Sequence, residues 1–285
     1  MFFLIILIQL IAHQALALNR TVLATLKPDY LTASFIDLSA RRITSIESNT
    51  FDSLAQIINL HLNSNDLIEL NDANVFKSLT QLEELWLHDN FLETLHPLLF
   101  ENLGNLKSLT LYLNRLTLLD SRLFSNLVRL EVLYLFQNKL TSLNDSSLFS
   151  TTTQLKELNL GSNEISELDA NLFVGLTNLE ELVLESNLFT KLTPFDASLS
   201  NSLKKLLLNN NMLTNLDART FQKLSQLREL HLYFNNIISI DSLTFVGLLN
   251  LEKVFLYKNP ISDILPMYVT RLCSTNAKCT IQVEL

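Results

Sequence analysis

Hydrophobic and polar residues alternate in a short block that recurs along most of the chain. The block reads L-x-x-L-x-L-x-x-N, as in LEELWLHDN at residues 82–90 and LEVLYLFQN at residues 130–138. Asparagines close it at spacings of 24 or 25 residues: Asn65, Asn90, Asn114, Asn138, Asn163, Asn187, Asn211, Asn235 and Asn259. Side chains alternate between the two faces of a strand, so L-x-L predicts a short strand with its leucines buried. A fixed period of this length predicts a repeat fold whose strands stack in parallel.

Three further positions of the repeat have a structural interpretation. Each asparagine lies where the chain leaves its strand, and its amide can bond to backbone groups of its own turn and the neighbouring one. Two residues later comes a residue that we expect to fill the space behind the strand: Leu67, Leu92, Leu116, Leu140, Ile165, Leu213 and Ile237. On the far side a recurring aromatic predicts a stacked spine: Phe51, Phe76, Phe100, Phe124, Phe149, Phe173, Phe221 and Phe245.

An earlier copy of the block, SFIDLSARRI, begins at Ser34 and has Arg41 in place of the asparagine, which makes ten copies. This pattern resembles the typical class of extracellular leucine-rich-repeat proteins, which includes Toll-like receptor ectodomains, Slit and small secreted insect-type recognition proteins. The resemblance implies an α/β repeat, a right-handed curved solenoid with a parallel β-sheet on its concave face and mostly irregular or short helical convex segments. We place the ten repeats at residues 34–260. Such a fold hosts many activities, so function has to be argued from the sites on it.

Two repeats depart from the pattern. After Phe149, threonines replace the usual leucine, and Ala197 stands where the spine expects phenylalanine, with Phe195 two residues earlier. We interpret both segments as irregular surface loops.

The first 17 residues, MFFLIILIQLIAHQALA, form an apolar run that ends in Ala15-Leu16-Ala17. This ending predicts a signal peptide, residues 1–17, that is cleaved after Ala17. The run is shorter than the ~20 apolar residues that span a membrane, and the C-terminal TIQVEL is not the hydrophobic tail of a lipid-anchor signal. We therefore expect a secreted, extracellular chain without stable membrane insertion. A truncated receptor ectodomain is the alternative.

A stacked repeat fold exposes an apolar cross-section at each end and needs a cap there. Residues 18–33 are the predicted N-terminal cap, in which we expect Thr21 to Leu26 as an edge strand, without the cysteines common in the family. A partner protein covering this end is the alternative. Residues 261–285 resemble a shortened C-terminal cap of the family and contain the only cysteines, Cys273 and Cys279. In a secreted protein this pair predicts a disulfide, since a zinc site would need further ligands.

Composition narrows the class of partner. The chain has 285 residues, of which 48% are hydrophobic, with only 4 Gly and 5 Pro, as expected of a folded chain with a large core. Its net charge of −8 argues against nucleic acid, whose binding requires clustered cations. Two sequons predict N-glycosylation at Asn19 and Asn144.

Large aromatic residues cluster on the strand face that the leucines leave exposed. The first aromatic patch, in the third to fifth repeats, contains Trp86, His88, Tyr112, Tyr134 and Phe136. The second aromatic patch, in the last two repeats, contains His231, Tyr233, Phe234, Phe255 and Tyr257. Strands about 4.8 Å apart bring the members of each patch together. Clustered exposed aromatics are typical of protein interfaces; the alternative is that they cover their neighbours in the sheet.

The charged residues and the candidate catalytic residues say less about function than the aromatic patches do. Acidic residues flank several strands, which leaves a basic partner or a solvated face as alternatives: Glu83, Glu84, Asp89, Glu157, Glu180, Glu181 and Glu185. His61 and His88 occur near Asp37 and Asp89, but in different columns of the sheet and without a phosphate loop or nucleophile elbow. We expect no enzymatic activity, no metal and no cofactor.

The predicted function is that of a secreted recognition or scaffold protein. Its concave aromatics would bind a protein partner, or a glycan or microbial surface component, and the resemblance implies innate immunity, cell adhesion or developmental guidance. The alternative is a self-associating structural, matrix or adhesion component, including a homodimer.

Overall fold

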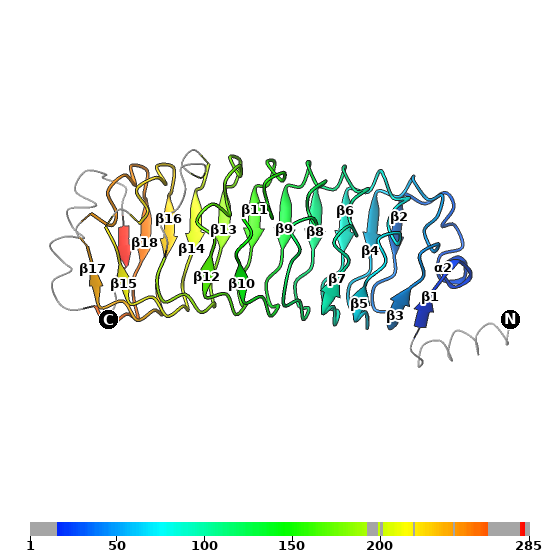
Figure 1. Ribbon diagram of the computed structural model, residues 1–285, viewed down its shortest axis with the longest axis horizontal. Helices are drawn as coiled ribbons and strands as arrows, with labels where there is room; N and C mark the ends of the chain where they lie inside the picture. Colours follow the sequence, from blue (N-terminus) through cyan, green and yellow to red (C-terminus); the bar gives the residue numbers. More distant parts are fainter. Residues whose placement is uncertain are drawn as a thin grey trace. The chain divides into compact units, whose positions relative to one another are not determined.

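The structure is a computed structural model that describes residues 16–192, 199, 202–218, 220–241, 243–261 and 280–282 (Figure 1). The chain divides into two compact units, whose boundary lies between Lys139 and Leu140. Several sequence-based predictions lie outside the described residues: the signal peptide up to residue 15, the irregular loop at Phe195 and Ala197, and the disulfide between Cys273 and Cys279.

Short strands make up most of the regular structure of both units. The first unit contains β1 (Leu16–Leu18), α2 (Arg20–Leu26), β2 (Phe35–Asp37), β3 (Ile43–Ile46), β4 (Asn59–His61), β5 (Glu69–Leu70), β6 (Glu84–Trp86), β7 (Thr94–Leu95), β8 (Ser108–Thr110) and β9 (Val132–Tyr134). The second unit contains β10 (Ser142–Leu143), β11 (Glu157–Asn159), β12 (Glu167–Leu168), β13 (Glu181–Val183), β14 (Lys205–Leu207), β15 (Asn215–Leu216), β16 (Glu229–His231), β17 (Ser239–Ile240), β18 (Lys253–Phe255) and β19 (Thr280–Gln282).

Each unit contains a parallel sheet built from one strand per repeat. In the first unit the order is β2-β4-β6-β8-β9, and in the second it is β11-β13-β14-β16-β18-β19. The pairing keeps the same repeat position in register, so that Leu85 lies between Leu60 and Leu109, and all three are fully buried. Neighbouring strands lie side by side in Figure 1. The predicted leucine-rich-repeat solenoid is confirmed.

Asparagine side chains join each repeat to the one before it. The amide nitrogen of Asn114 donates to the carbonyl oxygens of Leu111 and Leu87, both at 3.0 Å, and its oxygen accepts from the Leu92 amide at 3.0 Å. Leu87 and Leu92 belong to the preceding repeat, which Asn114 therefore closes. The same bonds recur at other asparagines of both units, including Asn90, Asn187, Asn211, Asn235 and Asn259. The predicted ladder of buried amides is confirmed.

The residue before each of these asparagines has a left-handed backbone. Its φ lies between 51° and 58° at Ser64, Asp89, Leu113, Gln137, Ser162, Ser186, Asn210, Phe234 and Lys258. This conformation is unfavourable for residues with a Cβ and worst for bulky ones. The turn itself imposes it, since Ala40 also has a φ of 54° in the first repeat, where Arg41 stands in place of the asparagine.

The core behind the sheet follows the predicted pattern. Phenylalanine rings stack along the chain, with 6.2 Å between the ring centroids of Phe51 and Phe76 and 6.3 Å between those of Phe221 and Phe245. Thr152, in the threonine-rich segment, is fully buried at the position of the usual leucine, and its hydroxyl donates to the Phe149 carbonyl at 2.9 Å. The local hydrogen bond satisfies the polar atom, so threonine can replace leucine in this core.

The N-terminal segment differs from the prediction of an edge strand at Thr21 to Leu26. These residues belong to helix α2, whose N-cap Asn19 accepts a hydrogen bond from the Val22 amide at 3.0 Å. The cap satisfies a helix-end donor, and the helix buries Leu23 completely. Strand β1 pairs instead, with β3. Leu18, the first residue after the predicted cleavage point, accepts hydrogen bonds at its carbonyl from the Glu47 amide and the Thr50 hydroxyl.

Two-residue strands after the asparagine turns were not predicted. They form the parallel pairs β5-β7, β10-β12 and β15-β17. Each strand is too short for an alternating pattern to be recognised in the sequence.

Replacing Asn114 by alanine should lower the free energy of unfolding by roughly 2–3 kcal/mol, because two buried carbonyls and one buried amide lose their partner. Urea denaturation followed by circular dichroism measures the change.

The matched control is Asn126→Ala, which removes an exposed side chain bonded to the Glu101 carbonyl. We expect a loss below about 1 kcal/mol there. Equal losses in the two variants would show that the buried ladder has no special weight.

Candidate functional site

The first aromatic patch forms two rows of rings on the exposed face of the first unit's sheet. In one row His88 stacks on Tyr112 and Tyr112 stacks on Phe136, with ring centroids 4.2 Å and 4.3 Å apart and ring planes within 9° of parallel. In the other row Trp86 lies beneath the ring of His61, at 3.6 Å. Tyr134 packs on Phe136 at 6.3 Å. The structure therefore brings together all five residues predicted for this patch.

The stacking decides which part of each ring solvent can reach. Tyr112 has His88 on one face and Phe136 on the other, so only its edge remains open. The small residue Thr110 is buried among these larger side chains, and its hydroxyl lies 2.8 Å from Nδ1 of His88. The rings thus cover their neighbours, as the alternative interpretation predicted, and each of the five remains partly exposed.

The second aromatic patch has the same organisation in the second unit. Tyr233 stacks on Tyr257 at 4.6 Å with ring planes 8° apart, and His231 packs on Phe255 at 4.4 Å. Phe234 lies edge-on to both tyrosines. All five predicted residues lie together here as well.

Three histidines lie within these surfaces, and burial favours their neutral form. Burial lowers the pKa of His61, and the nearby carboxylates of Asp37 and Glu84 only partly oppose it. Burial likewise lowers the pKa of His88 and of His231, although Glu229 has its carboxylate 3.2 Å from Nε2 of His231. Neutral imidazoles stack on their aromatic neighbours without the cost of burying a charge.

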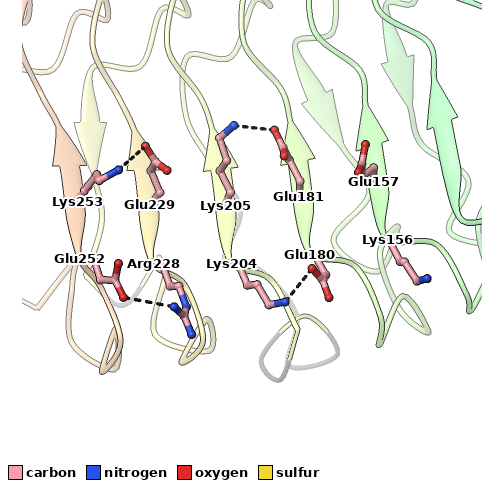
Figure 2. A pocket seen from close by; sticks show the side chains of 10 residues that line it. All are labelled: Lys156, Glu157, Glu180, Glu181, Lys204, Lys205, Arg228, Glu229, Glu252 and Lys253. Carbon is pink, nitrogen blue, oxygen red and sulfur yellow. Dashed lines mark hydrogen bonds and ion pairs between the residues drawn. The ribbon is translucent and has the colours of Figure 1, made fainter.

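Charged residues line a groove of about 370 Å³ at the beginning of the second unit's strands (Figure 2). Four ion pairs join adjacent strands there: Glu180–Lys204 at 2.8 Å, Glu181–Lys205 at 2.9 Å, Arg228–Glu252 at 3.5 Å and Glu229–Lys253 at 3.7 Å. Five acidic and five basic residues line the groove, so their formal charges cancel. The pairing favours the solvated-face interpretation over a basic partner, and pairs this exposed contribute little to stability.

Other candidate sites of the sequence are less organised. The described residues contain no group of three His, Cys, Asp or Glu side chains placed to hold a metal ion. The Asp37 carboxylate, which the sequence places near His61, accepts hydrogen bonds from the amide and hydroxyl of Ser39. Within the described ranges no helix is both long and apolar enough to cross a bilayer.

The predicted glycosylation sites differ in their surroundings. Asn144 is exposed just after β10, whereas Asn19 is half-buried and caps α2. Glycosylation at both stays a prediction.

Two residues of the aromatic face were not predicted as partner-binding. His61 was considered only for a metal or acid/base site. Its stacking on Trp86 could have been inferred because both occupy the same repeat position on adjacent strands. Leu113 follows Tyr112 and is 40% exposed. The sequence does single it out, because Leu113 is an apolar residue directly before a ladder asparagine, where most repeats have a polar residue.

Comparisons place the fold among known proteins. The family model for leucine rich repeats matches residues 80–140, 137–189 and 201–263. No curated protein matches the chain.

Solved structures resemble the chain over most of its length. A chain of the Toll–Spatzle complex of Drosophila has a TM-score of 0.70 and 27% identity, and the match covers 85% of this chain and 36% of that one. A chain of the TLR13–ssRNA13 complex has a TM-score of 0.64 and 24% identity over 88% of this chain and 32% of that one. A chain of the LRIM1/APL1C complex has a TM-score of 0.64 and 20% identity, and the match covers 85% of this chain and 51% of that one. The TLR13 and LRIM1/APL1C matches are below 25% identity and show the fold alone. The chain spans about a third of the length of the matched chain in the Toll–Spatzle complex.

Acidification should destabilise the protein through His61, His88 and His231. Their folded pKa lies below the usual 6.5, so the unfolded chain binds more protons as the pH falls. Their contribution is complete above pH 6.5 and is lost as the pH falls through 6.5 and then through the lower folded pKa. We expect a lower thermal midpoint at about pH 5.5 than at about pH 7.5.

The double variant His61→Phe, His88→Phe keeps two stacked rings and removes two titrating groups. Its midpoint should fall less over the same pH range. A fall as large as that of the wild type would contradict the role of these histidines.

Proposed function

The chain belongs to the leucine-rich repeat family, and on that premise we propose that it is a non-enzymatic binding protein of the extracellular type, which contacts a protein partner through its aromatic patches. The partner-binding residues proposed are Trp86, His88, Tyr112, Tyr134 and Phe136 in the first patch, and His231, Tyr233, Phe234, Phe255 and Tyr257 in the second.

The stacking of the rings is the observation that carries this proposal. Sugars and nucleic-acid bases stack on the free face of an aromatic ring, whereas Tyr112 has both faces covered by His88 and Phe136. Ring edges and apolar side chains instead suit a protein surface, where edge-to-face packing is favourable. Large aromatics at the centre of an interface commonly supply most of its binding energy.

The Toll–Spatzle structure supports the same class of partner. Toll is described in complex with Spatzle, as a molecular hub in Drosophila development and innate immunity. We propose secretion, a protein partner and a role in innate immunity for this chain on that analogy. Glycans at Asn19 and Asn144 and a disulfide between Cys273 and Cys279 belong to the same proposal.

Affinity capture from the native extracellular fluid tests the proposal. The wild type is compared with Tyr134→Ser, Phe136→Ser in one double variant and with Tyr233→Ser, Tyr257→Ser in another. We expect a discrete protein whose recovery falls at least about 10-fold in one of them, because two anchoring rings are lost.

Leu118→Ser is the matched control, since Leu118 is 71% exposed and lies outside both patches. It should retain the partner, and circular dichroism should show that all variants fold. Capture of the chain by itself alone would favour the self-associating alternative. Equal capture by all variants would place the binding surface elsewhere.

A further inference from the structure

Phe234 combines two features that a fold normally avoids. Its backbone is left-handed, with φ of 51°, and its side chain is 51% exposed. Both are unfavourable for a large aromatic residue. The equivalent position is polar in seven of the nine repeats with a ladder asparagine, and only Leu113 and Phe234 are large and apolar: Ser64, Asp89, Leu113, Gln137, Ser162, Ser186, Asn210, Phe234 and Lys258.

The ladder does not need the phenylalanine ring. The Phe234 amide donates to the Tyr257 carbonyl at 3.1 Å, a bond that any residue except proline can make. Asn235 then makes the buried side-chain bonds to the Leu208 and Leu232 carbonyls. Ser162 and Ser186 occupy the same position with the same left-handed backbone. A small polar residue would therefore serve the fold at position 234.

The ring instead extends the second aromatic patch around the turn. Phe234 meets Tyr233 with ring centroids 5.8 Å apart at 68°, and Tyr257 at 6.1 Å and 76°. Both contacts are edge-to-face, so the two tyrosines hold one side of the phenylalanine while its other side faces solvent. The result is a supported apolar projection at the rim of the patch.

Positive charge lies beside this projection. Lys258 occupies the equivalent position one repeat later, directly after Tyr257, is exposed, and makes no ion pair within the described part of the chain. Two carboxylates act on residues of the second patch, and both have partners: Glu185, whose charge acts on Tyr233, accepts a hydrogen bond from the Asn209 side chain at 2.9 Å, and Glu229 lies 3.7 Å from Lys253 and 3.2 Å from Nε2 of His231. Aromatic ring edges also carry partial positive charge. A complementary surface would combine an apolar pocket with carboxylates at its rim.

We propose that Phe234 is the anchor of the second aromatic patch and inserts into an apolar, acid-rimmed pocket of a protein partner, whose carboxylates pair with Lys258. This inference rests on the proposed function and specifies the partner's chemistry.

A stability measurement separates an anchor from a structural residue. Phe234→Asn places in the left-handed turn a residue that tolerates it, so the thermal midpoint should rise by about 2–4 °C. Leu113→Asn, the matched control, should show a similar rise, since Leu113 has φ of 54°. A fall in the midpoint for Phe234→Asn alone would mean that the ring stabilises the fold, and would overturn the inference.

A binding measurement tests the partner's chemistry. Short random peptides displayed on phage are selected on the wild-type protein. We expect enriched sequences that combine large apolar residues with Asp or Glu, and a fall in their binding of at least about 10-fold for Phe234→Asn. Lys258→Glu should also weaken binding, whereas Leu118→Ser, outside both patches, should not. Enriched peptides without acidic residues, or equal binding by Phe234→Asn, would overturn the inference.

The capture experiment distinguishes this inference from the proposed function. A native partner that the Tyr134→Ser, Phe136→Ser variant loses and Phe234→Asn fully retains would refute the anchor and leave the proposed function standing. A wild type that captures no protein at all would refute the proposed function itself.

Discussion

The buried asparagine amide is the constraint on which each turn of the structure depends. Where the chain leaves a strand and begins the next turn, backbone carbonyls and amides are buried in an apolar interior. An unpaired polar group is costly there. One side chain such as Asn114 forms hydrogen bonds with backbone groups of two consecutive repeats. The residue before it has a left-handed backbone, as does Ala40 before Arg41 in the first repeat.

Much of this could be predicted from the sequence, because the interacting residues recur at a fixed spacing. The amide ladder, the spine and the membership of both aromatic patches are of this kind. The helix at Arg20–Leu26 was missed since it lies outside the repeat and depends on a local cap by Asn19. The orientation of the rings could not be predicted from the sequence either. Repeat positions identify Tyr112 and Phe136 as neighbours, but only the structure shows that their rings lie face to face.

The exposed face of each unit's sheet combines a structural role with the proposed one in recognition. Its aromatic rings cover one another and shield small residues such as Thr110, so part of their role is structural. In the groove of the second unit the formal charges cancel through pairs such as Glu181–Lys205. Phe234 differs from its neighbours because the turn that carries it would be equally well closed by serine.

The bonds of the asparagine also bear on how such a chain can change in evolution. Each asparagine side chain bonds to the preceding repeat. The alignment of repeat positions is therefore preserved when a whole segment of 24 or 25 residues is duplicated or deleted, and is lost when only part of a repeat is. Unequal recombination can therefore lengthen or shorten the chain in whole repeats without disturbing its core. Every such event would move one row of exposed residues, and a binding surface could be rearranged without a single change in the residues that hold the fold.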